Sequence, residues 1–369
     1  MEKIKRFIEC LIPVTACNLK CSYCYVIQRD NRKLEIPKLN FSPETIGQAL
    51  NKERFGGTCY FSICGAGETL VPDYMVAVVR EILKQGHFVN ITTNGTLNKR
   101  FDELISLDKD LLKKLNISFS FHYLELKRLN KMEDFFNNIK KCRENGISFV
   151  LQINLCDEYM PYIDDIKKIC KDEVGAYPQV AATRKEEKKL QNIELLTEKT
   201  EEEYYKEGEK FESPLFEFTM KNFNVKRKEF CYAGDWSFTL NLQTGRLSKC
   251  YAMPLAQNIF KDINKPIKFE AIGNNCQSRY CFNSSHFMSL GVIPELDTPT
   301  YGELRNRKEA NWYASQEIIE GFNSKLNESN QEYSKAKKIR VNLKNRFIIL
   351  SAKSTKKLRR KLKKWLKAE

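Results

Sequence analysis

Short apolar runs alternate with longer amphipathic segments over the first half of the chain. Six runs of strand length are predicted as β-strands: Phe7–Thr15, Thr58–Cys64, Phe88–Thr93, Asn116–His122, Ser148–Leu155 and Gln179–Thr183. Between them, apolar residues at helical spacing predict helices at Ser42–Arg54, Pro72–Gln85, Met132–Asn145 and Tyr162–Lys171. This alternation predicts an α/β fold of parallel strands with helical crossovers. Six units are too few for a closed eight-stranded barrel, so we expect a partial (β/α)6 barrel over residues 1–184.

The pattern changes after this first part. Residues 185–228 are dense in Lys and Glu and predict a charged helical insertion or linker. Within residues 229–300, the strand-like runs Trp236–Leu242 and Arg246–Tyr251 are joined by a short Gln-Thr-Gly turn, which predicts a β-hairpin. Residues 301–369 are polar and predict a helical C-terminal extension that ends in a basic tail.

Composition narrows the class of protein. The 369 residues suit two or three compact units, and no apolar run reaches the roughly 18 residues that span a bilayer. Glu9 and Pro13 interrupt the apolar N-terminus, so we expect a cytoplasmic protein and no secretion signal. The net charge is +15, but residues 353–369 hold nine basic side chains against one acidic. The body is only mildly basic and shows no specific nucleic-acid motif.

Cysteine is unusually frequent: the chain has thirteen cysteines and only three histidines. An odd, large number of cysteines without a secretion signal favours thiolate metal ligation over a disulfide scaffold. Six cysteines lie outside the two groups described below, and we interpret them as small buried apolar residues: Cys10, Cys59, Cys64, Cys142, Cys156 and Cys170. For Cys64 the alternative is a place at a ligand pocket, because it directly precedes the Gly65–Glu68 segment.

Three cysteines follow the first predicted strand directly. Cys17, Cys21 and Cys24 have spacings of four and three, and Tyr23 precedes the third. Three thiolates are one fewer than a closed zinc site or a fully ligated cluster needs, so one metal position stays open. The pattern Cys-x3-Cys-x2-Cys resembles the signature of the radical S-adenosylmethionine (SAM) superfamily. A zinc knuckle or unrelated core cysteines are the alternatives.

The resemblance implies a cofactor and a chemistry. In that family a [4Fe–4S] cluster on the three cysteines binds SAM and cleaves it reductively to a 5′-deoxyadenosyl radical, which abstracts a substrate hydrogen. The resemblance also implies a one-electron reductant such as flavodoxin or ferredoxin. The segment Cys64-Gly65-Ala66-Gly67-Glu68 resembles the family's Gly-Gly-Glu motif for the SAM amine. It differs by the inserted Ala66 and by Thr69 where proline is common.

Polar residues on predicted buried strands supply further candidates. Strand Asn116–His122 alternates polar with apolar side chains, and strand Ser148–Leu155 places Gln152 and Asn154 on one face. Polar side chains inside a parallel barrel need a partner. By the resemblance, the following residues contact SAM: Tyr23, Gly65, Gly67, Glu68, Asn94, Ser120, His122 and Asn154. The alternative is that small polar residues merely fill a tapering barrel.

A second cysteine group lies on the predicted hairpin and beyond it. Cys231, Cys250, Cys276 and Cys281 are enough to ligate a second cluster fully. The spacing Cys-x13-Gly-x4-Cys resembles the hairpin of the SPASM domain, or its shortened "twitch" form, which implies an auxiliary [4Fe–4S] cluster. A zinc site made of the same four thiolates is the alternative.

These features predict a radical SAM enzyme, with its catalytic residues beyond the cofactor sites undetermined. Because such hairpins occur in peptide-modifying members, a peptide or protein is the expected substrate. A sugar or nucleotide sugar is the second possibility and an RNA base the third. A different class, a non-catalytic thiolate-metal electron carrier, has no need of the Gly65–Glu68 segment or of polar strand faces.

The basic tail has an apolar stripe of its own. Leu358, Leu362, Trp365 and Leu366 share one side of a helix within Lys353–Glu369. Such a helix is typical of peripheral contact with an anionic membrane. Packing against the protein body and non-specific attraction to RNA or an acidic substrate are the alternatives.

Overall fold

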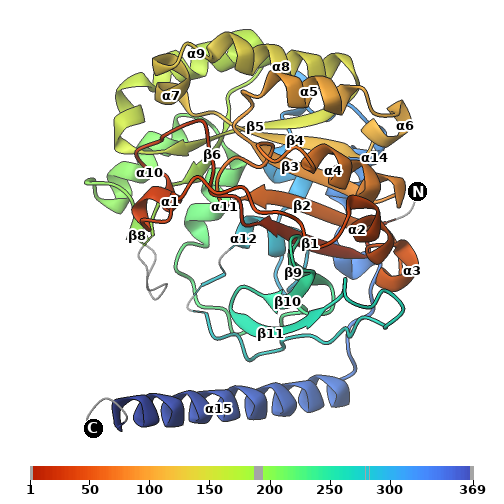
Figure 1. Ribbon diagram of the computed structural model, residues 1–369. Coiled ribbons are helices and arrows are strands. Elements are labelled where there is room, and N and C mark those ends of the chain that lie inside the picture. Colours follow the sequence, from red (N-terminus) through yellow and green to blue (C-terminus); the bar gives the residue numbers. More distant parts are fainter. Residues whose placement is uncertain (1–2, 187–193, 279, 282, 366–369) are drawn as a thin grey trace.

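The computed structural model describes residues 3–186, 194–278, 280–281 and 283–365, with residues 352–365 described as helix backbone only. Its centre is a nine-stranded sheet in the order β11-β10-β9-β1-β2-β3-β4-β5-β6. Strands β1 to β6 are parallel to their neighbours and form the predicted partial barrel (Figure 1). Their bounds are Arg6–Ile12, Cys59–Gly65, Phe88–Thr93, Leu115–Ser120, Ser148–Leu155 and Gln179–Ala182. The α/β fold class predicted from the sequence is therefore confirmed.

Helical crossovers cover the outer face of this sheet (Figure 1). They are α2 Pro43–Ala49, α3 Lys52–Phe55, α4 Met75–Lys84, α5 Asn98–Ile105, α6 Lys109–Leu112, α7 Tyr123–Arg128, α8 Met132–Glu144 and α9 Ile163–Val174, with a 3-10 turn at Asp157–Tyr162. Two further 3-10 turns, Lys308–Ala310 and Leu326–Glu328, lie in the C-terminal part of the chain. The single helix predicted at Ser42–Arg54 is two helices. The chain breaks at Asn51 because its side chain accepts from the Arg54 N–H and caps a new helix.

The predicted hairpin is present as β9 (Ser237–Asn241) and β10 (Arg246–Cys250), followed by β11 (Met253–Asn258). Strand β9 also pairs in parallel with β1, from Phe7 opposite Ser237 to Leu11 opposite Asn241. The hairpin therefore continues the barrel sheet at its β1 edge. This pairing places the start of β9, which follows the Cys231 segment, beside the start of β1, and the hairpin turn beside the end of β1.

The charged segment after β6 contains short strands and two helices. They are β7 Arg184–Lys185, β8 Glu194–Leu195, α10 Glu201–Glu209 and α11 Pro214–Lys221. Helix α11 packs on β6, and its residues Leu215 and Phe216 are buried. The short helices α1 (Tyr25–Gln28) and α12 (Ser284–Phe287) lie on the same side of the barrel as α11 (Figure 1).

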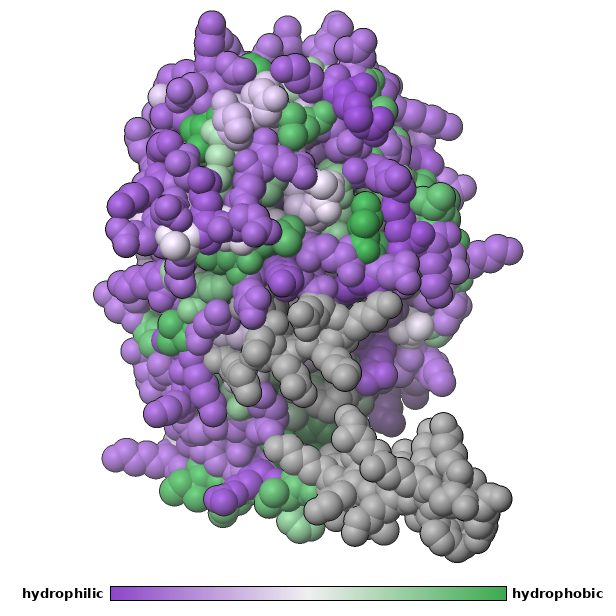
Figure 2. Space-filling model, turned by 90° about the vertical axis from the view of Figure 1, so that its left-hand side faces the viewer, coloured by the Kyte–Doolittle hydropathy of each residue, from purple (hydrophilic) through white to green (hydrophobic). Residues whose placement is uncertain are grey.

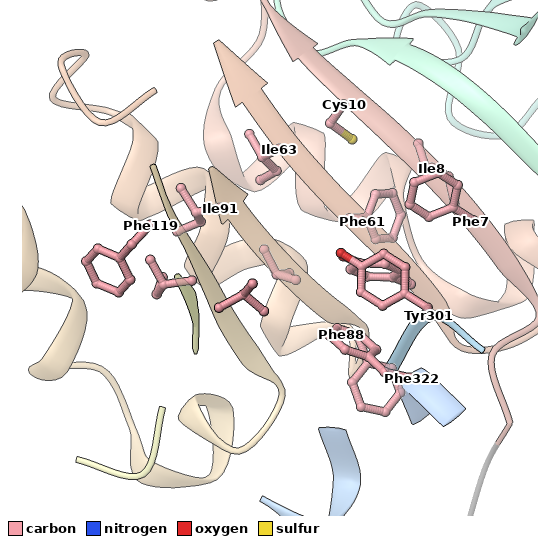
Figure 3. Close-up of a cluster of buried hydrophobic side chains, with 14 of the residues drawn as sticks. Phe7, Ile8, Cys10, Phe61, Ile63, Phe88, Ile91, Phe119, Tyr301 and Phe322 are labelled. Atoms are coloured by element: carbon pink, nitrogen blue, oxygen red, sulfur yellow. The ribbon is translucent and has the colours of Figure 1, made fainter. Parts of the chain in front are cut away.

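Aromatic side chains close the end of the barrel where the strands begin. Tyr301, on α13 (Tyr301–Arg305), and Phe322, on α14 (Gln316–Asn323), are fully buried. The Tyr60 hydroxyl donates to that of Tyr301 at 2.7 Å, and the rings of Tyr60 and Phe322 are 4.6 Å apart. Figure 3 shows Tyr301 and Phe322 at this end of the barrel, and the rings of Phe88 and Phe322 are 6.2 Å apart. The chain after residue 300 is thus part of the barrel's hydrophobic core.

The chain ends in a long helix, α15 (Lys335–Trp365), below the rest of the molecule (Figure 1). Within the described residues, no helix combines the length and the apolar character needed to cross a bilayer. The side chains of the predicted tail stripe, Leu358, Leu362 and Trp365, and the whole of Leu366 lie outside what the structure describes.

Candidate functional site

A cavity of about 400 Å³ opens at the C-terminal ends of the parallel strands, where sites of barrel enzymes form. Its wall contains the three cysteines of the first group and each predicted SAM-contact residue: Cys17, Cys21, Cys24, Tyr23, Gly65, Gly67, Glu68, Asn94, Ser120, His122 and Asn154. The sequence therefore identified residues that the fold brings to one place.

The first cysteine loop is held by backbone and side-chain contacts. The Cys17 sulfur accepts from the Leu19 N–H at 3.4 Å and from Asn94 Nδ2 at 3.8 Å. The Arg32 guanidinium donates to the carbonyls of Cys17 and Leu19. Burial raises the pKa values of the Cys17 and Cys21 thiols, and repulsion from the Cys24 thiolate raises them further.

This donor set fits a metal group that brings its own positive charge. The Cys17 and Cys24 sulfurs lie close enough to disfavour ionisation of Cys21, and a bound cation would reverse that effect because thiolates are the metal-binding form. Among the described residues, no three His, Cys, Asp or Glu side chains are already arranged around a single metal position. The residues thus suit a cluster ligated by three thiolates that retains an open iron.

The end of β2 touches the cysteine loop backbone to backbone. The Gly67 N–H donates to the Val14 carbonyl at 2.6 Å, and the Glu68 N–H donates to the Ala16 carbonyl at 2.9 Å. A Cβ atom at Gly67 would lie 2.2 Å from the Ala16 oxygen, which no real Cβ tolerates. Only glycine allows this approach. The segment Gly65–Glu68 therefore sets the position of the residue before Cys17.

Glu68 braces two strand ends from inside the fold. Its carboxylate accepts from the Thr93 hydroxyl at 2.7 Å, the Asn94 N–H at 2.7 Å and the Leu70 N–H at 2.9 Å. Burial raises its pKa, while these three hydrogen bonds oppose the rise. The carboxylate therefore ties β2 to β3 and fixes Asn94, whose amide reaches Cys17.

A row of three hydrogen-bonded side chains lies behind the cysteine loop. The Tyr23 hydroxyl is 2.6 Å from His122 Nδ1 and 3.1 Å from the Tyr159 hydroxyl. Burial lowers the pKa of His122 to about 4, so its imidazole is neutral at pH 7. With Tyr23 donating to Nδ1, the ring proton of His122 sits on Nε2, as a donor for a ligand.

The polar residues of β4 and β5 lie at two depths in the barrel. Ser120 of β4, and Gln152 and Asn154 of β5, line the cavity. Asn116 and Ser118 lie deeper, where both donate to Asn90 Oδ1 on β3, at 2.7 and 2.9 Å. The upper residues are thus placed for a ligand, and the lower ones donate to Asn90 within the barrel.

The second cysteine group surrounds a single region beside the same cavity. The thiolates of Cys250, Cys276 and Cys281 all act to raise the pKa of Cys231, after the larger effect of its burial. Burial raises the pKa of Cys250 to about 11 and that of Cys281 to about 12. The Cys231 segment bridges to Gly273, which holds the two halves of the group together. Four thiols are the number that a fully ligated cluster or a zinc site needs, although no three of them surround one metal position among the described residues.

One part of the cavity wall was not predicted from the sequence. Asn283 and His286, at α12, line the cavity together with Cys281. Asn283 Nδ2 donates at 2.9 Å to the carboxylate of Glu9 on β1, and burial raises the pKa of Glu9 to about 8. No local motif marks these residues, because they meet only through the pairing of distant segments.

Comparison with known proteins places the first part of the chain in a family. Residues 11–169 match the sequence model of the Radical SAM superfamily. No curated protein sequence matches the chain. This part of the chain is a radical SAM domain, with the cysteine loop after its first strand. For this part of the chain, the Radical SAM superfamily implies a [4Fe–4S] cluster and SAM.

Several solved structures resemble the protein. SuiB of Streptococcus suis bound to S-adenosylmethionine is 16% identical, with a TM-score of 0.43, 70% of this chain covered and 62% of SuiB. Native anSMEcpe with bound AdoMet is 16% identical, with a TM-score of 0.45, 85% of this chain covered and 98% of the other. HydG, a maturase of the [FeFe]-hydrogenase, is 12% identical, with a TM-score of 0.43, 94% of this chain covered and 82% of HydG. The chain thus spans about 62% of the length of SuiB.

Proposed function

We propose that this enzyme binds a [4Fe–4S] cluster through Cys17, Cys21 and Cys24, cleaves SAM there and modifies a peptide or protein. The observation that carries the proposal is the single cavity that joins the cysteine loop, the polar strand ends and Cys281. When bound, the cluster would pass one electron, taken from an external reductant such as flavodoxin or ferredoxin, to the sulfonium of SAM. Cleavage of the S–C5′ bond would then release methionine and a 5′-deoxyadenosyl radical that abstracts a substrate hydrogen.

The chain's own residues hold and shape that chemistry. Gly67 and Glu68 set the loop position, and Asn94 supports Cys17. Ser120, Asn154 and the Nε2 proton of His122 offer hydrogen-bonding groups for the ribose and adenine of SAM. The buried walls keep bulk water from the reacting atoms.

The size of the cavity supports a substrate that enters by one side chain. Ligand pockets commonly have volumes of roughly 300–1,000 Å³, and the cavity of about 400 Å³ lies near the lower limit. SAM occupies much of that space, so a whole nucleotide sugar fits poorly beside it. One side chain of a polypeptide fits, while its backbone stays outside. The four cysteines of the second group are proposed to hold an auxiliary [4Fe–4S] cluster beside the substrate.

The test is iron content and SAM cleavage after anaerobic reconstitution. We expect about seven to eight irons per chain for two [4Fe–4S] clusters. Replacing Cys17, Cys21 and Cys24 by Ala should halve the iron and abolish 5′-deoxyadenosine formation. The control is Cys142→Ala with Cys170→Ala, which removes two buried thiols outside the cavity and should leave both readouts unchanged. SAM cleavage that survives the triple change would overturn the proposal.

The substrate class has its own measurement. Peptides and nucleotide sugars are added separately to the reconstituted enzyme, and 5′-deoxyadenosine is measured against the uncoupled rate. Stimulation by peptides alone is expected. Stimulation by nucleotide sugars alone would leave the SAM chemistry intact and replace the peptide by a carbohydrate.

A further inference from the structure

Helix α15 has an exposed apolar stripe. Ile339, Leu343, Phe347 and Leu350 are 57–74% exposed and recur at spacings of four, four and three, so they share one face of the helix. Figure 2 shows hydrophobic surface at the lower edge of the molecule, the level at which α15 lies in Figure 1.

The opposite side of α15 is fixed to the protein. Val341 and Asn345 are buried, and Asn345 Nδ2 donates to the carbonyls of Ala271 and Ile272 at 2.9 and 3.1 Å. Each of these two residues follows a stripe residue by two positions, about 200° around the helix. The stripe therefore faces away from the body, where a flat surface reaches it without a clash.

The charge on α15 is of one sign. Its 31 residues include fourteen Lys or Arg and no Asp or Glu. Lys344 pairs with Glu270. Arg340 and Arg346 are exposed and form no ion pair within the part of the chain that the structure describes. These cations flank an apolar face, which is the arrangement of helices that lie in the interface of an anionic membrane.

We propose that α15 docks the enzyme on an anionic lipid surface, with the stripe from Ile339 to Leu350 inserted between the headgroups and the flanking cations on lipid phosphates. The inference does not depend on the substrate or on the second cluster. It gives the protein a second surface, separate from the cavity, that recognises phospholipid.

Other partners fit the exposed stripe of α15 less well than a lipid surface does. A second copy of α15 would bring fourteen positive charges against fourteen with no acidic partner, and like charges across a helix pair are destabilising. Single-stranded nucleic acid is bound through stacked aromatic side chains, whereas three of the four stripe residues are aliphatic. The protein's own body does not cover the stripe, because it packs against the opposite face of α15.

The experiment is flotation of the reconstituted full-length enzyme with two kinds of vesicle. One is phosphatidylcholine alone, and the other contains 30% phosphatidylglycerol. We expect binding only to the second, weakened by 0.5 M salt because the attraction is partly ionic. The variant with Ile339, Leu343, Phe347 and Leu350 all replaced by Gln keeps every charge and a good helix former. Its affinity for the anionic vesicles should fall at least tenfold.

The control variant is Leu34→Gln with Ile36→Gln, which removes two exposed apolar side chains from the loop between α1 and α2 and should float like wild type. Thermal unfolding and SAM cleavage of the stripe variant should match wild type, since the replaced side chains are exposed. Equal flotation of wild type and stripe variant would reduce the contact to charge alone and overturn the proposal. The proposal would also be overturned if the wild-type enzyme did not float with anionic vesicles. It would be overturned as well if sedimentation showed that the wild-type enzyme is a dimer and the stripe variant a monomer.

Discussion

Gly67 shows how one residue without a side chain can control a metal site. Its Cα stands so close to the cysteine loop that a Cβ would lie 2.2 Å from the Ala16 oxygen and 2.8 Å from the Thr15 carbonyl carbon. Both neighbours are backbone atoms, which cannot rotate aside as a side chain can. The spacing between β2 and the loop before Cys17 therefore depends on this glycine.

This contact leads to a prediction for Gly67→Ala. The added methyl must push the loop away from β2, which breaks the hydrogen bonds of Gly67 and Glu68 to the loop carbonyls. We expect iron on the first cysteine group to fall by half or more and SAM cleavage to fall at least a hundredfold. Iron analysis and 5′-deoxyadenosine formation measure the two effects.

Gly146→Ala provides the matched control. A Cβ at Gly146 meets nothing within 4 Å, but φ is +74°, so alanine there costs about 1 kcal/mol of stability through the backbone alone. Its melting temperature should fall by a few degrees while iron and SAM cleavage stay normal. If Gly67→Ala behaves in the same way, the close approach has no role in holding the cluster.

Among the elements, the hairpin β9–β10 has the largest consequence for the site. Because β9 pairs with β1, the chain segment that carries Cys231 is attached to the strand that leads into Cys17. The sharp turn at Gly245, with φ +73°, returns β10 toward Cys250. Both cysteine groups therefore depend on one strand pair for their relative position.

Removing the second group should uncouple the two halves of the reaction. We expect the pair Cys250→Ala with Cys281→Ala to lower the iron to about four per chain, because two remaining thiolates do not hold a [4Fe–4S] cluster. SAM cleavage without substrate should persist, and substrate modification should be lost. Iron and zinc analysis with product detection measure this.

The same measurement distinguishes the kind of metal. One zinc and about four irons in the wild-type enzyme would identify the second group as a structural zinc site. In that case the double variant should lose the zinc and a few kcal/mol of stability while its iron stays at four.

At the scale of the whole molecule, the C-terminal third closes the barrel. Tyr301, Trp312 and Phe322 are all fully buried, and the Trp312 indole donates to the Val174 carbonyl at 3.0 Å. The Phe149 N–H donates to the Trp312 carbonyl at 3.0 Å, at the start of β5. Residues after 300 are therefore needed by the barrel itself, although they contribute nothing to the first cysteine loop.

Two truncations should separate the core part of this segment from the tail. Met1–Pro299 removes Tyr301, Trp312 and Phe322 together with other buried aromatics. Deletion of one large buried aromatic costs about 3–5 kcal/mol, so these losses approach the whole stability of a typical domain. We expect this truncated chain to lack a cooperative thermal transition. Met1–Ser351 keeps all three residues and should melt within a few degrees of wild type and cleave SAM normally. Cooperative melting of Met1–Pro299 would show that the barrel closes without them.

The sequence by itself determined the strands of the barrel and the first cysteine loop. Strands β3 and β5 have the predicted ends, because a buried parallel strand is a local apolar run bounded by turn residues. The loop Cys17–Cys24 was visible because its three donors are neighbours in the chain. The polar residues Ser120, His122 and Asn154 were found because a polar side chain on a buried strand needs a reason.

Tertiary structure decided what depends on pairing between distant segments. No local pattern could show that β9 pairs with β1, since parallel pairing leaves no turn between the strands to mark it. The hydrogen bond between Glu9 and Asn283 could not be predicted either, because the two residues are 274 positions apart in the sequence. Likewise the stripe from Ile339 to Leu350 looks like any amphipathic helix in the sequence. Only the burial of Val341 and Asn345 shows which face of α15 the body uses and which face it leaves exposed.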